Sequence, residues 1–223
     1  MTEQEWLACT DPTPMLRLLV ERHTSERKLR LLACACCRLI WDHLIDPRSR
    51  QAVEVAERFA DDRATLRELA YARAHAMKAA GGAAWAAYWA ANVKAAGPLW
   101  NAFAAAAAAP ARQAVLRARG RQADTWEAAQ ASSAREQVAL LRDVAGNPFR
   151  PADAEPAWRY HDGGIVVQLA EGIYEDRAFD RLPILADALE DAGCRAEALL
   201  AHCRADREHV RGCWAVDLIL GYD

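Results

Sequence analysis

The stretch SERKLRLLACACCRLI, residues 25–40, decides the fold class because its apolar side chains repeat with the period of an α-helix. Ser25 stands where a helix N-cap is expected, since its hydroxyl can accept a backbone N–H of the first turn. One face then carries apolar side chains at spacings of three, four, three and one: Leu29, Leu32, Cys36, Leu39 and Ile40. The segment is therefore predicted to be an amphipathic helix packed against others.

Helix-start signals recur on both sides of this stretch. Two are capping boxes and two place proline at the first helical position: Thr2 with Glu5, Thr65 with Glu68, Asp11 with Pro12, and Asp46 with Pro47. Sustained period-two alternation is absent from the sequence, and 164–169 is the one short strand candidate. The prediction is an all-α fold, either a multi-helix bundle or a helical array.

A long region rich in alanine and tryptophan, 83–145, occupies the centre of the chain. In a continuous helix Trp85, Trp89 and Trp100 would share one stripe. Gly97-Pro98 is expected to kink or restart that helix, and Pro110 is expected to begin the next one. Two interpretations stay open for the tryptophans. They fill the core between alanine-lined helices, or they form an exposed face that docks a protein partner or a second copy of the chain.

Turn-forming residues at Gly146, Asn147, Pro148 and Pro151 mark the clearest boundary in the sequence. They predict a helical domain over 1–146 and a smaller C-terminal helical subdomain over 147–223. The alternative is that both pack as one domain.

The most apolar stretch, 79–111, contains a single charge, Lys94, but is not expected to span a membrane. A span needs about 20 strongly apolar residues, whereas this stretch is mostly alanine and is interrupted by Asn92 and Gly97-Pro98. The first residues lack the basic start and apolar run of a secretory signal. Together with seven cysteines, an odd number, this favours a cytoplasmic, reduced protein.

Cysteines fall in two groups. Cys34, Cys36 and Cys37 lie on the apolar helix and are expected to pack in the core as small hydrophobic side chains. The second group, near the C-terminus, mixes ligand types that suit zinc, and the candidate ligands are Cys194, Cys203, His209 and Cys213.

The spacing of this second group matches no familiar zinc pattern, because it contains no pair of cysteines two residues apart. His202 adjoins Cys203, so only one of the two would face a given site on a helix. The alternative to zinc is buried cysteines beside exposed histidines.

Basic residues gather in two places, at Arg27, Lys28, Arg30 and Arg38, and at Arg112, Arg117, Arg119 and Arg121. Either group could contact phosphates, which suggests a small nucleic-acid binder. A net charge of −3 and the ordinary solvated face of a helix argue against that hypothesis.

The sequence offers no phosphate-binding glycine loop, nucleophile elbow or zinc-protease helix, so no catalytic residue and no organic cofactor is predicted. The leading hypothesis is a non-enzymatic helical module that works through protein contacts or regulation. Zinc binding and nucleic-acid binding are the alternatives.

Five blocks of sequence carry a resemblance: WLACTDP at 6–12, KLRLLACACCR at 28–38, NPFRP at 147–151, DRLPILADALEDAGC at 180–194 and HVRGCW at 209–214. The chain resembles a family of uncharacterised bacterial proteins with these blocks around a variable alanine-rich middle. That resemblance implies no activity, ligand or site residue. Relatives interleave arginine or aspartate with the tryptophans, whereas residues 79–111 of this chain have only Lys94.

Overall fold

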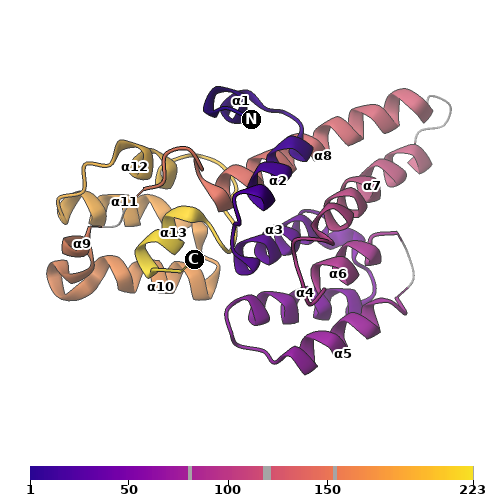
Figure 1. Cartoon of the computed structure of the whole chain (residues 1–223), viewed down its shortest axis with the longest axis horizontal. Helices are drawn as coiled ribbons and strands as arrows, with labels where there is room; N and C mark the ends of the chain where they lie inside the picture. Colours follow the sequence, from indigo (N-terminus) through magenta and orange to yellow (C-terminus); the bar gives the residue numbers. More distant parts are fainter. Residues whose placement is uncertain (80–81, 118–121, 153–154, 223) are drawn as a thin grey trace. The chain divides into compact units, whose positions relative to one another are not determined.

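A computed structural model confirms the all-α fold. It describes residues 1–79, 82–117, 122–152 and 155–222, and no strand occurs among them. The strand candidate at 164–169 is helical instead. The chain divides into two compact units, Met1–Arg142 and Asp143–Asp223 (Figure 1).

The first unit begins with short helices whose starts the sequence predicts correctly. At each start the cap side chain accepts a backbone N–H, and the caps are Thr2, Asp11, Ser25, Asp46 and Thr65. The corresponding helices are α1 (Glu3–Ala8), α2 (Pro12–Glu21), α3 (Glu26–Leu39), α4 (Pro47–Ala60) and α5 (Leu66–Ala76). A 3₁₀ turn, η1 (Trp41–His43), joins α3 to α4.

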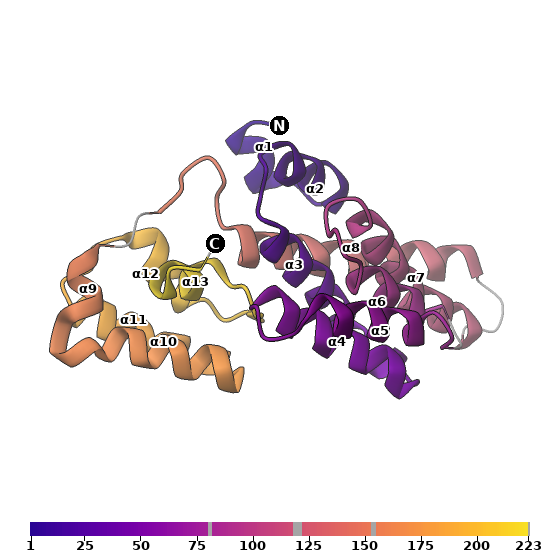
Figure 2. The same cartoon turned by 60° about the horizontal axis from the view of Figure 1, so that its bottom comes forward.

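Helix α3 lies at the centre of the first unit. It contacts α4, α6 (Ala84–Ala90) and α7 (Leu99–Arg117), and α4 and α6 can be seen next to it in Figure 2. Cys34, Cys36 and Cys37 are buried there, as predicted, and burial raises the pKa of each thiol well above its ordinary value. These cysteines therefore pack as uncharged apolar groups.

The alanine–tryptophan region is not one continuous helix. After α6 the backbone leaves the helix, and the carbonyls of Ala90, Asn92 and Val93 accept hydrogen bonds from the buried guanidinium of Arg30. The predicted stripe is consequently divided between α6 and α7. The alanines of α6 are buried, whereas Trp85 is 50% exposed and Trp89 and Trp100 are half-buried. The buried residues of α6 are therefore all alanine, and no indole of this helix is fully buried.

Pro110 lies inside α7, where the sequence predicts the start of a new helix. Proline removes one backbone donor and its ring crowds the preceding turn, so a helix start is its usual place. Here the alanine run 104–109, a strong helix former, precedes it, and the helix continues to Arg117. Helix α8 (Gln122–Ala145) lies beside α7, and the buried Gln137 amide donates to the Phe103 carbonyl over 2.8 Å.

The second unit takes the last residues of α8 and a set of shorter helices. These are α9 (Pro156–Tyr160), α10 (Ile165–Asp176), α11 (Leu182–Asp191), α12 (Glu197–Cys203) and α13 (Trp214–Leu220), with 3₁₀ turns η2 (His161–Gly164) and η3 (Phe179–Arg181). Gly193 and Gly221 have positive φ after α11 and α13, the left-handed conformation in which glycine commonly ends a helix. Asp180 lies within η3, and Arg181 precedes α11 without a side-chain cap.

No helix of the described residues is both long and apolar enough to cross a membrane. The alanine-rich stretch 79–111 is not one long apolar helix, because α6 has only seven residues and α7 begins after a break in the helix.

Candidate metal centre

Four buried side chains with metal-ligand chemistry converge in the second unit. Asp143 comes from the last turn of α8, His202 from α12, His209 from the following loop, and Cys213 from the residue before α13. Asp143 and Cys213 are fully buried, and the two histidines are at most 8% exposed. One donor atom from each lies within 4.8 Å of the others.

The carboxylate of Asp143 holds this cluster together. Its Oδ1 lies 2.6 Å from Nδ1 of His209 and 3.3 Å from Nε2 of His202. Its Oδ2 accepts the backbone N–H of Val210 over 2.9 Å. Cys213 Sγ completes the group, at 3.0 Å from His202 Nε2 and 4.0 Å from His209 Nδ1.

Local backbone geometry brings these residues to one point. Adjacent positions on α12 face different directions, so His202 turns to the cluster while Cys203 enters the apolar core. The loop then returns through Gly212, whose φ of +92° is a conformation that glycine adopts without strain. Cys213 follows at once as the N-cap residue of α13.

Charges within the cluster are set by burial and by hydrogen bonds. Burial alone would raise the pKa of Asp143, but hydrogen bonds from His202 and His209 outweigh it and lower that pKa to about 2. Burial lowers the pKa of His202, so its ring is neutral near pH 7. Burial and the nearby Asp143 charge raise the pKa of the Cys213 thiol well above its ordinary value. Without a metal, the cluster therefore contains a buried carboxylate beside the neutral ring of His202 and the neutral thiol of Cys213.

The donor set suits zinc better than the hard cations. Two imidazoles, a thiolate and a carboxylate are zinc ligands, whereas Ca²⁺ and Mg²⁺ prefer oxygen alone. A tetrahedral zinc site separates its ligand atoms by roughly 3.3–3.7 Å, given zinc bonds of about 2.0–2.3 Å. Four of the separations observed here, 2.6–4.0 Å, differ from that range by less than about 1 Å, and the donor atoms all lie within 4.8 Å of one another, so binding requires small shifts of the side chains. Zn²⁺ would also neutralise one carboxylate and one thiolate.

Two of the four ligands predicted from the sequence lie in the cluster, and the other two do not. His209 and Cys213 lie in the cluster, whereas Cys194 and Cys203 are in the apolar core of the unit. His202 takes the place of its neighbour Cys203. Asp143, 59 residues before His202, was not predicted; its one signal is a charge placed between the apolar residues Leu141 and Val144 of a helix.

Most of the first basic group makes internal contacts. Arg38 forms two hydrogen bonds with Glu57, Arg27 pairs with Asp61 over 3.1 Å, and Arg30 binds the backbone after α6. The second group cannot be placed in the same way. Arg119 and Arg121 lie outside the described residues, as do the side chains of Arg112 and Arg117.

The predicted interaction residues form part of an aromatic group on α6. Trp85 and Trp89 are stacked with ring centroids 6.5 Å apart, and Tyr88 meets both edge-on. Trp100 lies in the first turn of α7 and is half-buried.

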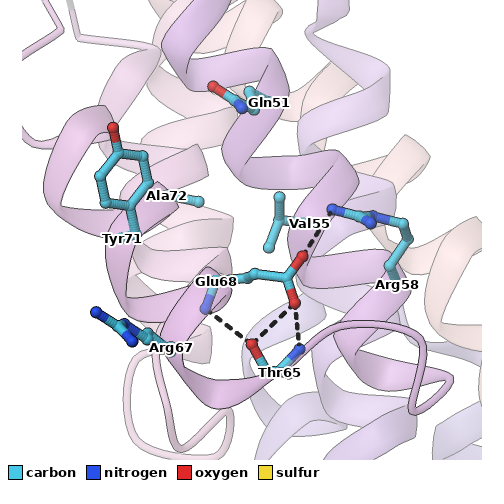
Figure 3. Close-up of a pocket in the computed structure, with 8 residues that line it drawn as sticks. All are labelled: Gln51, Val55, Arg58, Thr65, Arg67, Glu68, Tyr71 and Ala72. Atoms are coloured by element: carbon cyan, nitrogen blue, oxygen red, sulfur yellow. Dashed lines mark hydrogen bonds and ion pairs between the residues drawn. The ribbon is translucent and has the colours of Figure 1, made fainter.

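A hollow of about 310 Å³ lies between α4 and α5 (Figure 3). Val55 and Ala72 are its buried residues, and Tyr71, 62% exposed, stands at its edge. In its centre the Glu68 carboxylate accepts the backbone N–H and the hydroxyl of Thr65, each over 2.8 Å. Arg58 approaches the same carboxylate at 3.8 Å.

The chain matches no protein-family model, no curated protein and no solved structure. Any functional conclusion therefore rests on the geometry of the chain itself.

Proposed function

We propose that the second unit is a zinc-binding helical module whose metal is held by Asp143, His202, His209 and Cys213. The observation that supports this is the convergence of one oxygen, two nitrogens and one sulfur, from separate segments, within 4.8 Å. The nitrogens that face the cluster are Nε2 of His202 and Nδ1 of His209, so each imidazole directs one nitrogen toward the Asp143 carboxylate. A metal would also explain why a thiol faces two imidazoles.

The role we propose for this zinc is structural rather than catalytic. Catalytic zinc sites keep one position open for water or substrate, whereas structural sites are closed by four protein ligands. Here all four donors come from the chain, and each residue is at least 92% buried. Zinc would tie the loop between α12 and α13 to the end of α8.

Elemental analysis of the full chain, purified without an affinity metal or chelator, tests this proposal. We expect about one zinc per chain. Replacing zinc with Co²⁺ should give the visible absorption of tetrahedral cobalt together with a sulfur-to-cobalt charge-transfer band.

Cysteine variants supply the matched comparison. Cys213→Ser should abolish the charge-transfer band, whereas Cys203→Ser, which changes an equally buried cysteine of the apolar core, should keep it. A metal content near zero in the wild-type chain, with no cobalt band on reconstitution, would refute zinc binding.

We propose protein docking by the first unit as a second function, and the hollow between α4 and α5 is the observation that favours it. The amide of Gln51 and the hydroxyl of Tyr71 make no hydrogen bond within the described part of the chain, so both are available to a partner. Arg58 and Arg67 line the same hollow, while the Glu68 carboxylate is engaged by Thr65. This chemistry suits a short acidic segment carrying an aliphatic side chain.

A fluorescent probe peptide of alternating Glu and Leu tests the docking proposal by polarisation. Binding should be weakened by Tyr71→Ala and by Arg67→Gln, and salt should weaken it further. Tyr160→Ala is the control, because Tyr160 is an exposed tyrosine of the other unit. Equal polarisation with a Lys/Leu probe would contradict the charge preference.

A further inference from the structure

Both ring nitrogens of His202 have partners, and the two sets of partners lie on opposite sides of the ring. Nε2 points at the cluster, 3.0 Å from Cys213 Sγ and 3.3 Å from Asp143 Oδ1. On the other side, Nδ1 meets the guanidinium of Arg207, and the indole N–H of Trp214 donates to it over 2.8 Å.

These contacts determine where the proton of the ring lies. An indole N–H and a guanidinium can only donate hydrogen bonds, so Nδ1 must be the acceptor nitrogen. In the neutral ring the proton is then on Nε2, directed at Asp143. A zinc-bound histidine has the reverse arrangement, with a lone pair on the ligating nitrogen and an N–H on the other.

We propose that Arg207 and Trp214 set the metal affinity of the cluster by holding His202 in the tautomer that excludes the metal. This inference rests on the proposed zinc site and describes its control. Metal binding at Nε2 moves the ring proton to Nδ1, and the two donors must then leave that nitrogen. The positive charge of Arg207 opposes the incoming cation as well.

The two donors differ in how readily they can leave. Arg207 is an exposed residue, so its side chain can turn into solvent. Trp214 is half-buried, and its indole ring packs against Gly146, where an added Cβ would lie 3.0 Å from the ring. Arg207 is therefore the donor that leaves Nδ1 readily, whereas moving the Trp214 indole away from Nδ1 disturbs its packing on Gly146.

Titration of the metal-free full chain with Co²⁺ tests this inference. Arg207→Gln should bind Co²⁺ more tightly than wild type by about tenfold, the lower end of what groups around metal ligands contribute. Trp214→Phe should shift the affinity in the same direction. Arg204→Gln is the control, because it removes an exposed arginine three residues away that pairs with Asp187 and Glu190 instead.

A measurement without metal tests the tautomer directly. In ¹⁵N-histidine-labelled chain, long-range ¹H–¹⁵N correlation should show His202 protonated at Nε2, and Arg207→Gln should lessen that preference. Protonation at Nδ1, or an unchanged or weaker Co²⁺ affinity of Arg207→Gln, would overturn the inference. Cobalt binding by Arg207→Gln but not by wild type would support the inference and refute zinc binding by the natural chain. Binding by neither would refute both.

Discussion

The carboxylate of Asp143 is a buried charge that three N–H groups stabilise. Its pKa is about 2 in the folded chain, below the ordinary value of 3.8, because hydrogen bonds from the histidines outweigh burial. A lowered pKa means that the folded state favours the ionised form. Its contribution to stability is complete above the ordinary value and is lost as the pH falls toward 2.

We therefore expect the metal-free chain to lose about 2 kcal/mol of unfolding free energy from this group between pH 4 and pH 2. Asp143→Asn should be less stable at neutral pH but should show a shallower loss over that interval. Urea unfolding followed by tryptophan fluorescence across the pH range measures both. Parallel pH profiles for the two proteins would contradict this account of Asp143.

Thiol reactivity provides a second test at the scale of single residues. Six of the seven cysteines are buried, and Cys9 is partly exposed. A chromogenic disulfide reagent should therefore modify about one thiol per native chain quickly, because attack needs an accessible thiolate. Cys9→Ser should remove this fast phase, while denaturant should release the remaining thiols. A fast phase that survives Cys9→Ser would show that a thiol of the core is accessible.

At this scale the sequence identifies residue types better than positions. Cysteine and histidine near the C-terminus indicate metal chemistry, and two of the four predicted ligands do lie in the cluster. Whether His202 or Cys203 faces it depends on how α12 is rotated against its neighbours, which a single sequence does not reveal. Asp143 joins through a fold that connects distant segments, so spacing rules do not detect it.

For helices, local signals predict starts well and interruptions poorly. The caps at Thr2, Ser25 and Thr65 act within three residues of themselves, so the sequence is enough to recognise them. Gly97-Pro98 predicts the start of α7 at Leu99, but α6 already ends at Ala90, whose carbonyl binds Arg30 from 60 residues earlier in the chain. A long-range contact of this kind has no signature in the periodicity of the region.

The end of α8 gives a prediction about a single helix terminus. Gly146 has a φ of +62°, and a Cβ there would lie 3.0–3.2 Å from the Trp214 ring. Gly146→Ala should therefore destabilise the second unit by about 2 kcal/mol, through left-handed strain and displacement of the indole. Urea unfolding of the full chain measures the change.

Gly172→Ala is the matched control for that prediction. Gly172 lies within α10, and an added Cβ there would meet nothing within 4 Å. Alanine should stabilise the helix by about 0.5–1 kcal/mol, since glycine loses more backbone entropy on folding. If Gly146→Ala and Gly172→Ala shift stability in the same direction, the positive φ of Gly146 and its close packing on Trp214 do not determine the effect of an added Cβ there.

At the scale of the whole chain, the two units differ in what stabilises them. The first has α3 and its buried cysteines at its core, and the proposed zinc ligands all belong to the second. Because a ligand stabilises only the states that bind it, zinc at 100 times its dissociation constant would add about 2.7 kcal/mol to the second unit. Removal of zinc by a chelator should accordingly lower the stability of the second unit alone.

Hydrogen exchange followed by mass spectrometry resolves this difference along the chain. Removal of zinc with a strong chelator should speed exchange in α12, α13 and the loop between them, whose backbone Asp143 holds at Val210. Peptides from α3 and α4 should exchange at unchanged rates. In Cys213→Ser the chelator should have no effect on any peptide, whereas Cys203→Ser should respond like wild type. Faster exchange throughout the chain would instead mean that zinc stabilises both units together, which a site confined to the second unit does not explain.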